Sequence, residues 1–167
     1  LGDVYKRQVL TKPFFPSMLK QKIEAVRGVD DGEADDLAQV LSGKHFLAAE
    51  DNFLNAGILT DLLEMEGATV EIVENGQLAV ERFERSEPGE FDAILMDVQM
   101  PVMNGYEATK AIRRLNDPTR AQVPILAMTA DAFEEDRQKA LRSGMNGHLT
   151  KPVEIDKLFE ALDELLS

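Results

Sequence analysis

Short apolar runs alternate with longer amphipathic stretches along the chain from Lys44 onward. The runs have the length and composition of buried strands, and they cover Phe46–Ala49, Thr69–Val73, Ala93–Met96, Pro124–Met128 and His148–Thr150. The stretches between and after them have the period of helices, over residues 53–66, 76–86, 105–115, 132–143 and 154–166. Strands that alternate with helices predict crossover connections and a parallel sheet covered on both faces. We therefore predict one doubly wound α/β domain over residues 44–167.

An internal repeat lies outside this domain. Leu10–Pro13 has the same sequence as Leu149–Pro152, and the apolar positions 19 and 23 repeat the spacing of positions 158 and 162. We predict that residues 9–27 are the last strand and helix of a preceding copy, and that the acid-rich residues 28–43 are a linker. Residues 1–8 fit neither copy, and we predict that they are a non-native scar.

Composition and charge limit the classes of function. The 167 residues include no cysteine, which excludes disulfides and thiolate chemistry and fits a cytoplasmic protein. The net charge of −13 argues against nucleic-acid binding, which depends on neutralisation of phosphates by Lys and Arg. No apolar run approaches the roughly 20 residues that a membrane helix needs. We therefore expect no membrane contact by this part of the protein.

Four predicted strands end in residues that suit one chemistry. The first is followed by Glu50 and Asp51, the third by Asp97, the fourth by Thr129 and the fifth by Lys151. In a five-stranded sheet of order 2-1-3-4-5 these strands are neighbours, so the side chains would share the crevice at the carboxyl ends. Carboxylates this close repel one another unless a cation neutralises them, and oxygen ligands select a hard ion such as Mg²⁺. With a lysine and a hydroxyl they describe a site for phosphoryl transfer.

Each of these residues also has an ordinary interpretation on its own. Glu50, Asp51 and Thr129 are of types that cap helices, Asp97 is of a type common in loops, and Lys151 could be a solvated loop lysine. Their joint occurrence at four strand ends favours the site, because the coincidence is far less expected than any single one of these roles.

The arrangement resembles the receiver domain of two-component response regulators, and the resemblance covers residues 44–167. It rests on the motifs Ala49–Asn52, Met96–Gly105, Met128–Ala130 and Leu149–Pro152, in that order. The resemblance implies a flavodoxin-like three-layer sandwich whose phosphoacceptor is Asp97. It also implies a Mg²⁺ ion held by Asp51 directly, by Glu50 through water, by Asp97, and by the backbone carbonyl of Gln99.

The same resemblance assigns roles to further positions. Lys151 would pair with the carboxylate of Asp97 or with the incoming phosphoryl oxygens, and a cis peptide bond would join it to Pro152. Thr129 would hydrogen-bond the phosphoryl group and move together with the residue at position 148 to transmit its presence. His148 departs from the family, which usually has Tyr or Phe there, so a pH dependence of this switch becomes conceivable.

The loop after Asp97, the position of Asn55 and the preceding copy look most like the C-terminal receiver of a hybrid sensor histidine kinase. The resemblance implies a phosphorelay module rather than a conventional enzyme. It would take a phosphoryl group from a phosphohistidine of a histidine kinase or a histidine-phosphotransfer protein, catalyse that transfer itself, and lose the group slowly. The alternative is a pseudo-receiver that acts as an interaction module without being phosphorylated.

Two other classes of protein share features of this arrangement. A phosphatase of the haloacid dehalogenase type also uses an aspartate at a strand end, but such enzymes have a second Asp two places on, where this chain has Gln99. A flavodoxin-like cofactor binder should follow its first strand with a loop rich in hydroxyls and glycine, whereas Glu50 and Asp51 follow here. Both alternatives are therefore disfavoured.

Overall fold

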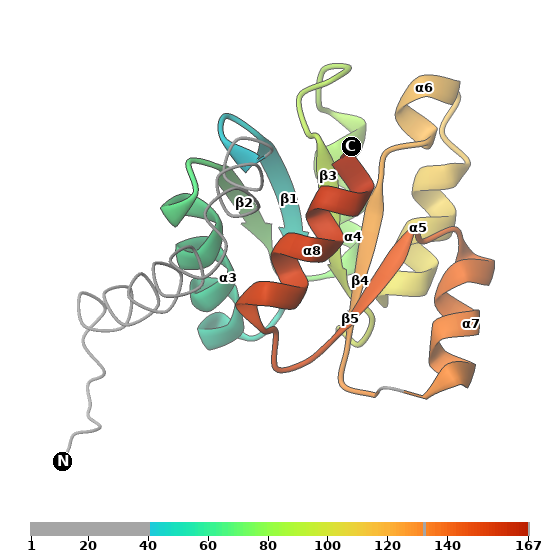
Figure 1. Ribbon diagram of the computed structural model, residues 1–167. Coiled ribbons are helices and arrows are strands. Elements are labelled where there is room, and N and C mark those ends of the chain that lie inside the picture. Colours follow the sequence, from blue (N-terminus) through green and yellow to red (C-terminus); the bar gives the residue numbers. More distant parts are fainter. Residues whose placement is uncertain (1–40, 132, 167) are drawn as a thin grey trace, which may run out of the picture. The chain divides into compact units, whose positions relative to one another are not determined.

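A five-stranded parallel sheet forms the centre of the domain (Figure 1). The computed structural model describes residues 41–131 and 133–166. The strands are β1 (His45–Ala49), β2 (Thr69–Val73), β3 (Ala93–Asp97), β4 (Ile125–Thr129) and β5 (Gly147–Thr150). Their order in the sheet is β2-β1-β3-β4-β5, which confirms the prediction. Because the chain runs from β1 outward to β2 and then returns to β3 on the other side, a switch point lies between β1 and β3.

Helices cover both faces of this sheet and make a three-layer sandwich. One face carries α3 (Phe53–Met65) and α8 (Ile155–Leu166), and the other carries α4 (Gly76–Glu84), α5 (Gly105–Arg113) and α7 (Glu134–Ser143), as Figure 1 shows. The predicted bounds of these helices agree with the observed ones to within two residues. The periodic apolar pattern was therefore sufficient to find every long helix of the described domain.

A short helix, α6 (Pro118–Ala121), was not predicted. Pro118 stands in its first turn, where a missing backbone N–H costs nothing. The side chain of Asp117 accepts hydrogen bonds from the backbone N–H groups of Thr119 and Arg120. Four residues are too few for a hydrophobic period to become visible, and this is why the sequence pattern missed the helix.

The core consists of apolar side chains that alternate between the two faces of the sheet. Leu47, Ile94 and Met96 belong to the cluster that packs with α4, α5 and α7. Their neighbours along the strands, such as Ala48 and Leu95, are buried on the opposite face of the sheet. Every residue of β3 and β4 is buried. Close packing on both sides fixes the carboxyl ends of these strands, where the predicted site residues stand.

The residues just before the predicted start of the domain are in contact with it. Leu41 is 1% exposed, and the backbone N–H of Gly43 donates to the carbonyl of Gly67. Residues 41–43 therefore pack against the domain that was predicted from residue 44. The predictions for residues 1–8, 9–27 and 28–40 concern positions outside the described residues. Within the described part, no helix combines the length and the apolar character needed to cross a membrane.

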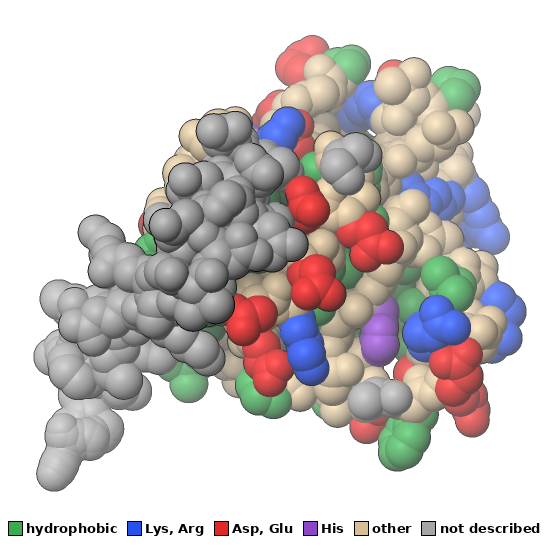
Figure 2. All heavy atoms as spheres, in the orientation of Figure 1, with side chains coloured by type: hydrophobic (Ala, Val, Ile, Leu, Met, Phe, Trp, Pro, Cys, Tyr) green, Lys and Arg blue, Asp and Glu red, His purple; other side chains and the backbone are tan. Residues whose placement is uncertain are grey.

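Acidic side chains gather over α8, which lies in front of the sheet (Figure 2). Asp156, Glu160 and Glu164 are exposed on this helix, whereas Leu158 and Leu162 are buried. The amphipathic pattern of the sequence thus matches the observed burial. The acidic outer surface is poorly suited to contact a phosphate backbone.

Candidate functional site

The predicted carboxylates meet at the carboxyl edge of the sheet. Asp97 is the last residue of β3, Glu50 directly follows β1, and both are 3% exposed. Asp51 is next to Glu50 and is exposed. One carboxylate oxygen from each of the three residues lies within 4.8 Å of the others. Two buried acids and one exposed acid therefore share one end of the crevice between β1 and β3.

None of these acids is used as a helix cap. The side chain of Asn52 caps α3, because it accepts a hydrogen bond from the backbone N–H of Asn55. The carboxylate of Glu50 instead accepts from the backbone N–H of Asn52 at 3.1 Å. In the same way, the helix α7 begins after Phe133, so Thr129 does not cap it. The ordinary interpretations of Glu50, Asp51 and Thr129 as caps are thus wrong.

Lys151 is the basic residue of the site. Its ammonium Nζ lies 2.9 Å from Oε1 of Glu50 and 3.0 Å from Oδ2 of Asp97. The Lys151–Pro152 peptide bond is cis, as the family resemblance implied. The backbone N–H of Lys151 donates to the carbonyl of Thr129 at 2.7 Å, which ties the loop after β5 to the end of β4. One ammonium group is therefore shared by the two buried carboxylates.

Burial dominates the protonation of this cluster. The pKa of Asp97 is raised to about 6, chiefly because burial disfavours the charged carboxylate, with repulsion by Glu50 in the same direction and the hydrogen bond from Lys151 opposing it. Burial also disfavours the charged form of Lys151, but its hydrogen bonds to Glu50 and Asp97 outweigh that effect and raise its pKa. Lys151 is thus charged, and it balances only part of the negative charge.

The donor set fits a hard divalent cation. All three side chains offer carboxylate oxygens, the ligand type that Mg²⁺ prefers. The backbone N–H of Gln99 donates to Oδ1 of Asp97 at 3.2 Å, so the Gln99 peptide is adjacent to the cluster. A bound cation would neutralise the remaining charge and lower the cost of keeping Asp97 and Glu50 ionised.

The loop after β3 contains a strained turn that the sequence did not reveal. Val102 has φ 70°, in the left-handed region that β-branched residues rarely adopt. The backbone N–H of Met103 donates to the carbonyl of Pro101 at 2.7 Å, which closes a three-residue turn around Val102. Strain of this kind is typical of functional loops.

The predicted switch residues lie on neighbouring strands. Thr129 ends β4 and is 3% exposed, and its hydroxyl accepts a hydrogen bond from the backbone N–H of Asp131 at 3.1 Å. His148 pairs in register with Ala127, two residues before Thr129, so both side chains belong to the same face of the sheet. Nε2 of His148 is buried and has no hydrogen-bond partner among the described residues. A cavity of about 520 Å³ beside it is lined by Arg137, Asn146 and Glu164, among others.

Large exposed apolar side chains follow three of the strand ends. Phe53 comes soon after β1 and is 94% exposed, Val102 comes after β3 and is 82% exposed, and Phe133 comes after β4 and is 68% exposed. Loops that leave the carboxyl ends of parallel strands lie on one edge of the sheet. We call these three residues the apolar rim. It escaped the sequence analysis because the sequence does not show which apolar residues of these loops are exposed.

The strand order, the acid cluster, the shared lysine and the threonine define a flavodoxin-like α/β domain with its site at the carboxyl edge, which is the class that contains receiver domains. Comparison with protein families then shows to which family of that class the chain belongs. Residues 46–163 match the family described as the response regulator receiver domain, and this chain belongs to that family. The predicted resemblance is confirmed.

Known proteins with similar sequences and structures support the same family. The chain is 38% identical over 145 residues to "Probable histidine kinase 2" of Oryza sativa subsp. indica, and the match covers 80% of this chain but 14% of that relative. It is also 38% identical to the receiver domain of a sensor histidine kinase from Pseudomonas aeruginosa PAO1, with a TM-score of 0.67 and coverage of 75% of this chain and 98% of that one. That structure has a magnesium ion coordinated in its active-site cleft.

A third similar protein was solved together with a partner. It is the receiver domain of Ssk1, in complex with the histidine phosphotransfer signaling protein Ypd1 from Saccharomyces cerevisiae. The chain is 34% identical to the matched structure with a TM-score of 0.65, and the match covers 74% of this chain and 88% of that one. The chain is thus a receiver domain, and it corresponds to a small part of the curated relative named above.

Proposed function

We propose that this domain is the phosphoacceptor of a two-component phosphorelay and takes a phosphoryl group from a phosphohistidine onto Asp97. The observation that carries the proposal is the geometry around the carboxylate of Asp97. It lies within 4.8 Å of carboxylate oxygens of Glu50 and Asp51, and Nζ of Lys151 is 3.0 Å from it. With a pKa of about 6, most Asp97 side chains are ionised at neutral pH and able to act as nucleophiles.

In the proposed reaction an oxygen of Asp97 attacks the phosphorus atom of the donor. The P–N bond breaks, and its electron pair stays on the imidazole nitrogen that leaves. The ammonium group of Lys151 interacts with the oxygens of the transferring group as charge develops on them. Mg²⁺ held by Glu50, Asp51, Asp97 and the carbonyl of Gln99 would supply further neutralisation of those oxygens.

Two events follow the transfer: a conformational response that involves Thr129, and the loss of the phosphoryl group, which the side chain of Gln99 affects. We propose that the hydroxyl of Thr129 gives up its hydrogen bond with Asp131 and donates to the phosphoryl group. This movement would bias the surface formed by α7, β5 and α8, near His148, as a shift of populations. Hydrolysis returns Asp97 as a carboxylate and requires the attacking water to lose a proton. The amide side chain of Gln99 cannot accept that proton, so loss of the phosphoryl group to water is expected to be slow.

The first experiment tests the phosphoacceptor. The protein is incubated with Mg²⁺ and acetyl phosphate, and its intact mass is measured. We expect one added phosphoryl group on the wild type and none on Asp97→Asn. Asp92→Asn is the matched control, because Asp92 stands just before the opposite end of β3, and it should be modified like the wild type. Uptake by Asp97→Asn equal to that of the wild type would show that Asp97 is not the acceptor, and no uptake by any of the proteins would favour the pseudo-receiver alternative.

We further propose that the phosphodonor is a histidine-phosphotransfer protein or a histidine kinase that docks on the apolar rim. A protein donor must bring its phosphohistidine to Asp97 and therefore has to cover the edge of the sheet that carries Phe53, Val102 and Phe133. Exposed apolar residues around a polar centre are typical of a protein contact. The similar receiver solved with a histidine phosphotransfer protein supports this kind of partner. We expect the exchange to take place in the cytoplasm.

The docking proposal is tested by separating contact from chemistry. Phe53→Ser and Phe133→Ser should slow transfer from a phosphorylated histidine-phosphotransfer protein by about tenfold or more, since buried aromatic side chains dominate such interfaces. Uptake from acetyl phosphate should be unchanged. Leu141→Ser is the control, because Leu141 is also exposed but lies near the end of α7. Equal transfer to all variants would argue against this docking surface.

A further inference from the structure

We infer that Gly76 is a positioning residue for the phosphoacceptor loop, an inference that rests on the proposed function and extends it beyond the acid cluster. Gly76 is the first residue of α4 and follows β2, whereas Asp97 ends β3, on the other side of β1. The backbone N–H of Gly76 donates to the carbonyl of Met103 at 3.0 Å. The start of α4 is thus bonded to the loop that follows Asp97.

The segment that Gly76 holds is the strained turn. Val102, at its centre, has φ 70° and is exposed, so packing of its own side chain cannot maintain this conformation. Residues in such conformations persist only where the surrounding structure determines them. The hydrogen bond from Gly76 reaches Met103, the last residue of the turn. At the other end of the loop, the N–H of Gly105 donates to the carbonyl of Val98 at 3.1 Å.

No side chain can be added at position 76 without moving this loop. A Cβ atom on Gly76 would lie 2.4 Å from the carbonyl oxygen of Met103 and 2.9 Å from that of Asn104. Both neighbours are backbone atoms, so a side-chain rotation cannot relieve the contact. The helix α4 is held by Ala79 and Phe83, which are buried. In the loop, Met100 and Met103 are only partly buried against the core, and Gln99, Pro101 and Val102 are exposed. We therefore expect the loop, rather than α4, to shift.

A shift of the loop would reach the reacting group directly. Gln99 stands in this loop, its N–H donates to Oδ1 of Asp97, and its carbonyl is the backbone ligand in the proposed site. Groups that orient metal ligands change metal affinity by about 10–100-fold when they are altered. We therefore assign to Gly76 the role of keeping the Gln99 peptide at the acid cluster, through Met103 and without any contact with the phosphoryl group.

The test compares two glycine-to-alanine changes. Gly76→Ala should weaken Mg²⁺ binding about tenfold or more, measured by titration calorimetry, and should slow uptake from acetyl phosphate. Gly57→Ala is the matched control, because Gly57 lies within α3 and a Cβ there meets nothing within 4 Å. It should bind Mg²⁺ like the wild type. If Gly76→Ala also binds Mg²⁺ like the wild type, the inference is overturned.

A readout without metal or donor separates this inference from the proposed function. In the presence of a chelator, the amides of Met103 and Gly105 should exchange faster in Gly76→Ala than in the wild type and in Gly57→Ala. Unchanged exchange would contradict the positioning role, even if the wild type takes up phosphate. If instead the wild type takes up no phosphoryl group, the proposed function fails, and affinity and exchange still decide the role of Gly76.

A second pair of variants applies if Gly76→Ala does not fold. The side chain of Asn75 accepts from the backbone N–H of Leu78 at 2.8 Å and caps α4, so Asn75→Ala loosens the start of this helix without adding an atom. Asp117→Ala removes the corresponding cap of α6. We expect a loss of Mg²⁺ affinity of a few-fold in Asn75→Ala and no loss in Asp117→Ala. Equal affinities would overturn the inference.

Discussion

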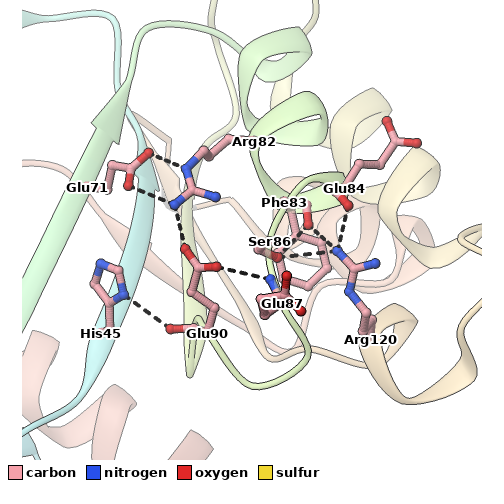
Figure 3. Close-up of polar contacts among 9 residues, drawn as sticks. All are labelled: His45, Glu71, Arg82, Phe83, Glu84, Ser86, Glu87, Glu90 and Arg120. Atoms are coloured by element: carbon pink, nitrogen blue, oxygen red, sulfur yellow. Dashed lines mark hydrogen bonds and ion pairs between the residues drawn. The ribbon is translucent and has the colours of Figure 1, made fainter.

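The domain contains the same arrangement of charges twice, once at the carboxyl edge of the sheet and once toward its amino edge. At the carboxyl edge, Lys151 lies between Glu50 and Asp97. Toward the amino edge, Arg82 lies between Glu71 and Glu90 (Figure 3). In each region one basic side chain contacts two carboxylates. The two regions share this contact of one base with two acids, and they differ most in their surroundings.

Burial separates the two regions. The side chains of Glu50 and Asp97 are 2% and 4% exposed, whereas those of Glu71 and Glu90 are 39% and 29% exposed. The pKa of Asp97 is accordingly raised by burial. The pKa of Glu90 is lowered, chiefly by the backbone N–H of Glu87 and then by Arg82. The comparison indicates that one base is enough to stabilise two acids at the surface. Two buried acids, in contrast, remain destabilised in their charged form and favour the binding of a further cation.

Removal of the basic residue should give the largest difference between the regions. Lys151→Met leaves two buried carboxylates without their ammonium group, and we expect phosphoryl uptake to slow by about 100-fold, as when one group that stabilises the transition state is lost. Arg82→Met should leave that rate unchanged and lower the free energy of unfolding by about 1 kcal/mol or less. Initial rates of uptake at saturating Mg²⁺ measure the difference. Similar uptake rates in Lys151→Met and Arg82→Met would contradict a special role of the buried lysine in the reaction.

Removal of the charge on Asp97 should stabilise the metal-free domain. Because the pKa of Asp97 is raised, its contribution to the stability of the fold is fully present below about pH 3.8. This contribution is lost as the pH rises through about 6. Asp97→Asn should therefore unfold with a free energy higher by on the order of 1–3 kcal/mol at pH 8. Denaturant unfolding in the presence of a chelator tests this, and the advantage should vanish near pH 4. Saturating Mg²⁺ should also reduce it, because the ion binds the wild type more tightly.

Much of this comparison was accessible from the sequence, and its limits have physical causes. Asp97 and Lys151 were predicted because the apolar runs show where the buried strands end. In a sheet of known strand order, the carboxyl ends of neighbouring strands lie side by side. The sequence could not give the raised pKa of Asp97, which depends on the depth of burial and on the distances to Lys151 and Glu50. The amino-edge cluster of Arg82 was not predicted, because its members are ordinary surface residues.

The loop after Asp97 shows a second limit of the sequence. The start of a helix at Gly105 was predicted and is observed. Val102, however, is of a type that disfavours positive φ, so the sequence does not indicate the strain that the structure shows there. Gly76 follows Asn75 and looked like an ordinary helix start. Its close approach to Met103 depends on the path of two loops that are distant along the chain, and only coordinates reveal it.

The carboxyl of Glu90 should show the opposite pH dependence to that of Asp97. Because the pKa of Glu90 is lowered, its contribution to stability is present above the pKa of the unfolded chain and is lost as the pH falls through the folded-state value. Glu90→Gln should thus be less stable than the wild type at neutral pH, and the difference should close in acid. Thermal unfolding from pH 3 to 8 measures both trends. A loss of the same sign for Glu90→Gln and Asp97→Asn would contradict the role assigned to burial.

Two buried threonines extend the comparison to uncharged groups. The hydroxyl of Thr109, in α5, is buried and has no hydrogen-bond partner among the described residues, whereas that of Thr129 accepts from Asp131. Thr109→Val should raise the free energy of unfolding by about 1 kcal/mol, because a buried polar group without a partner is replaced by an apolar group of the same shape. It should leave phosphoryl uptake unchanged, whereas Thr129→Val should slow it. If Thr109→Val slowed uptake as much, the hydroxyl at the end of β4 would have no special part in the reaction, and burial alone would account for both effects.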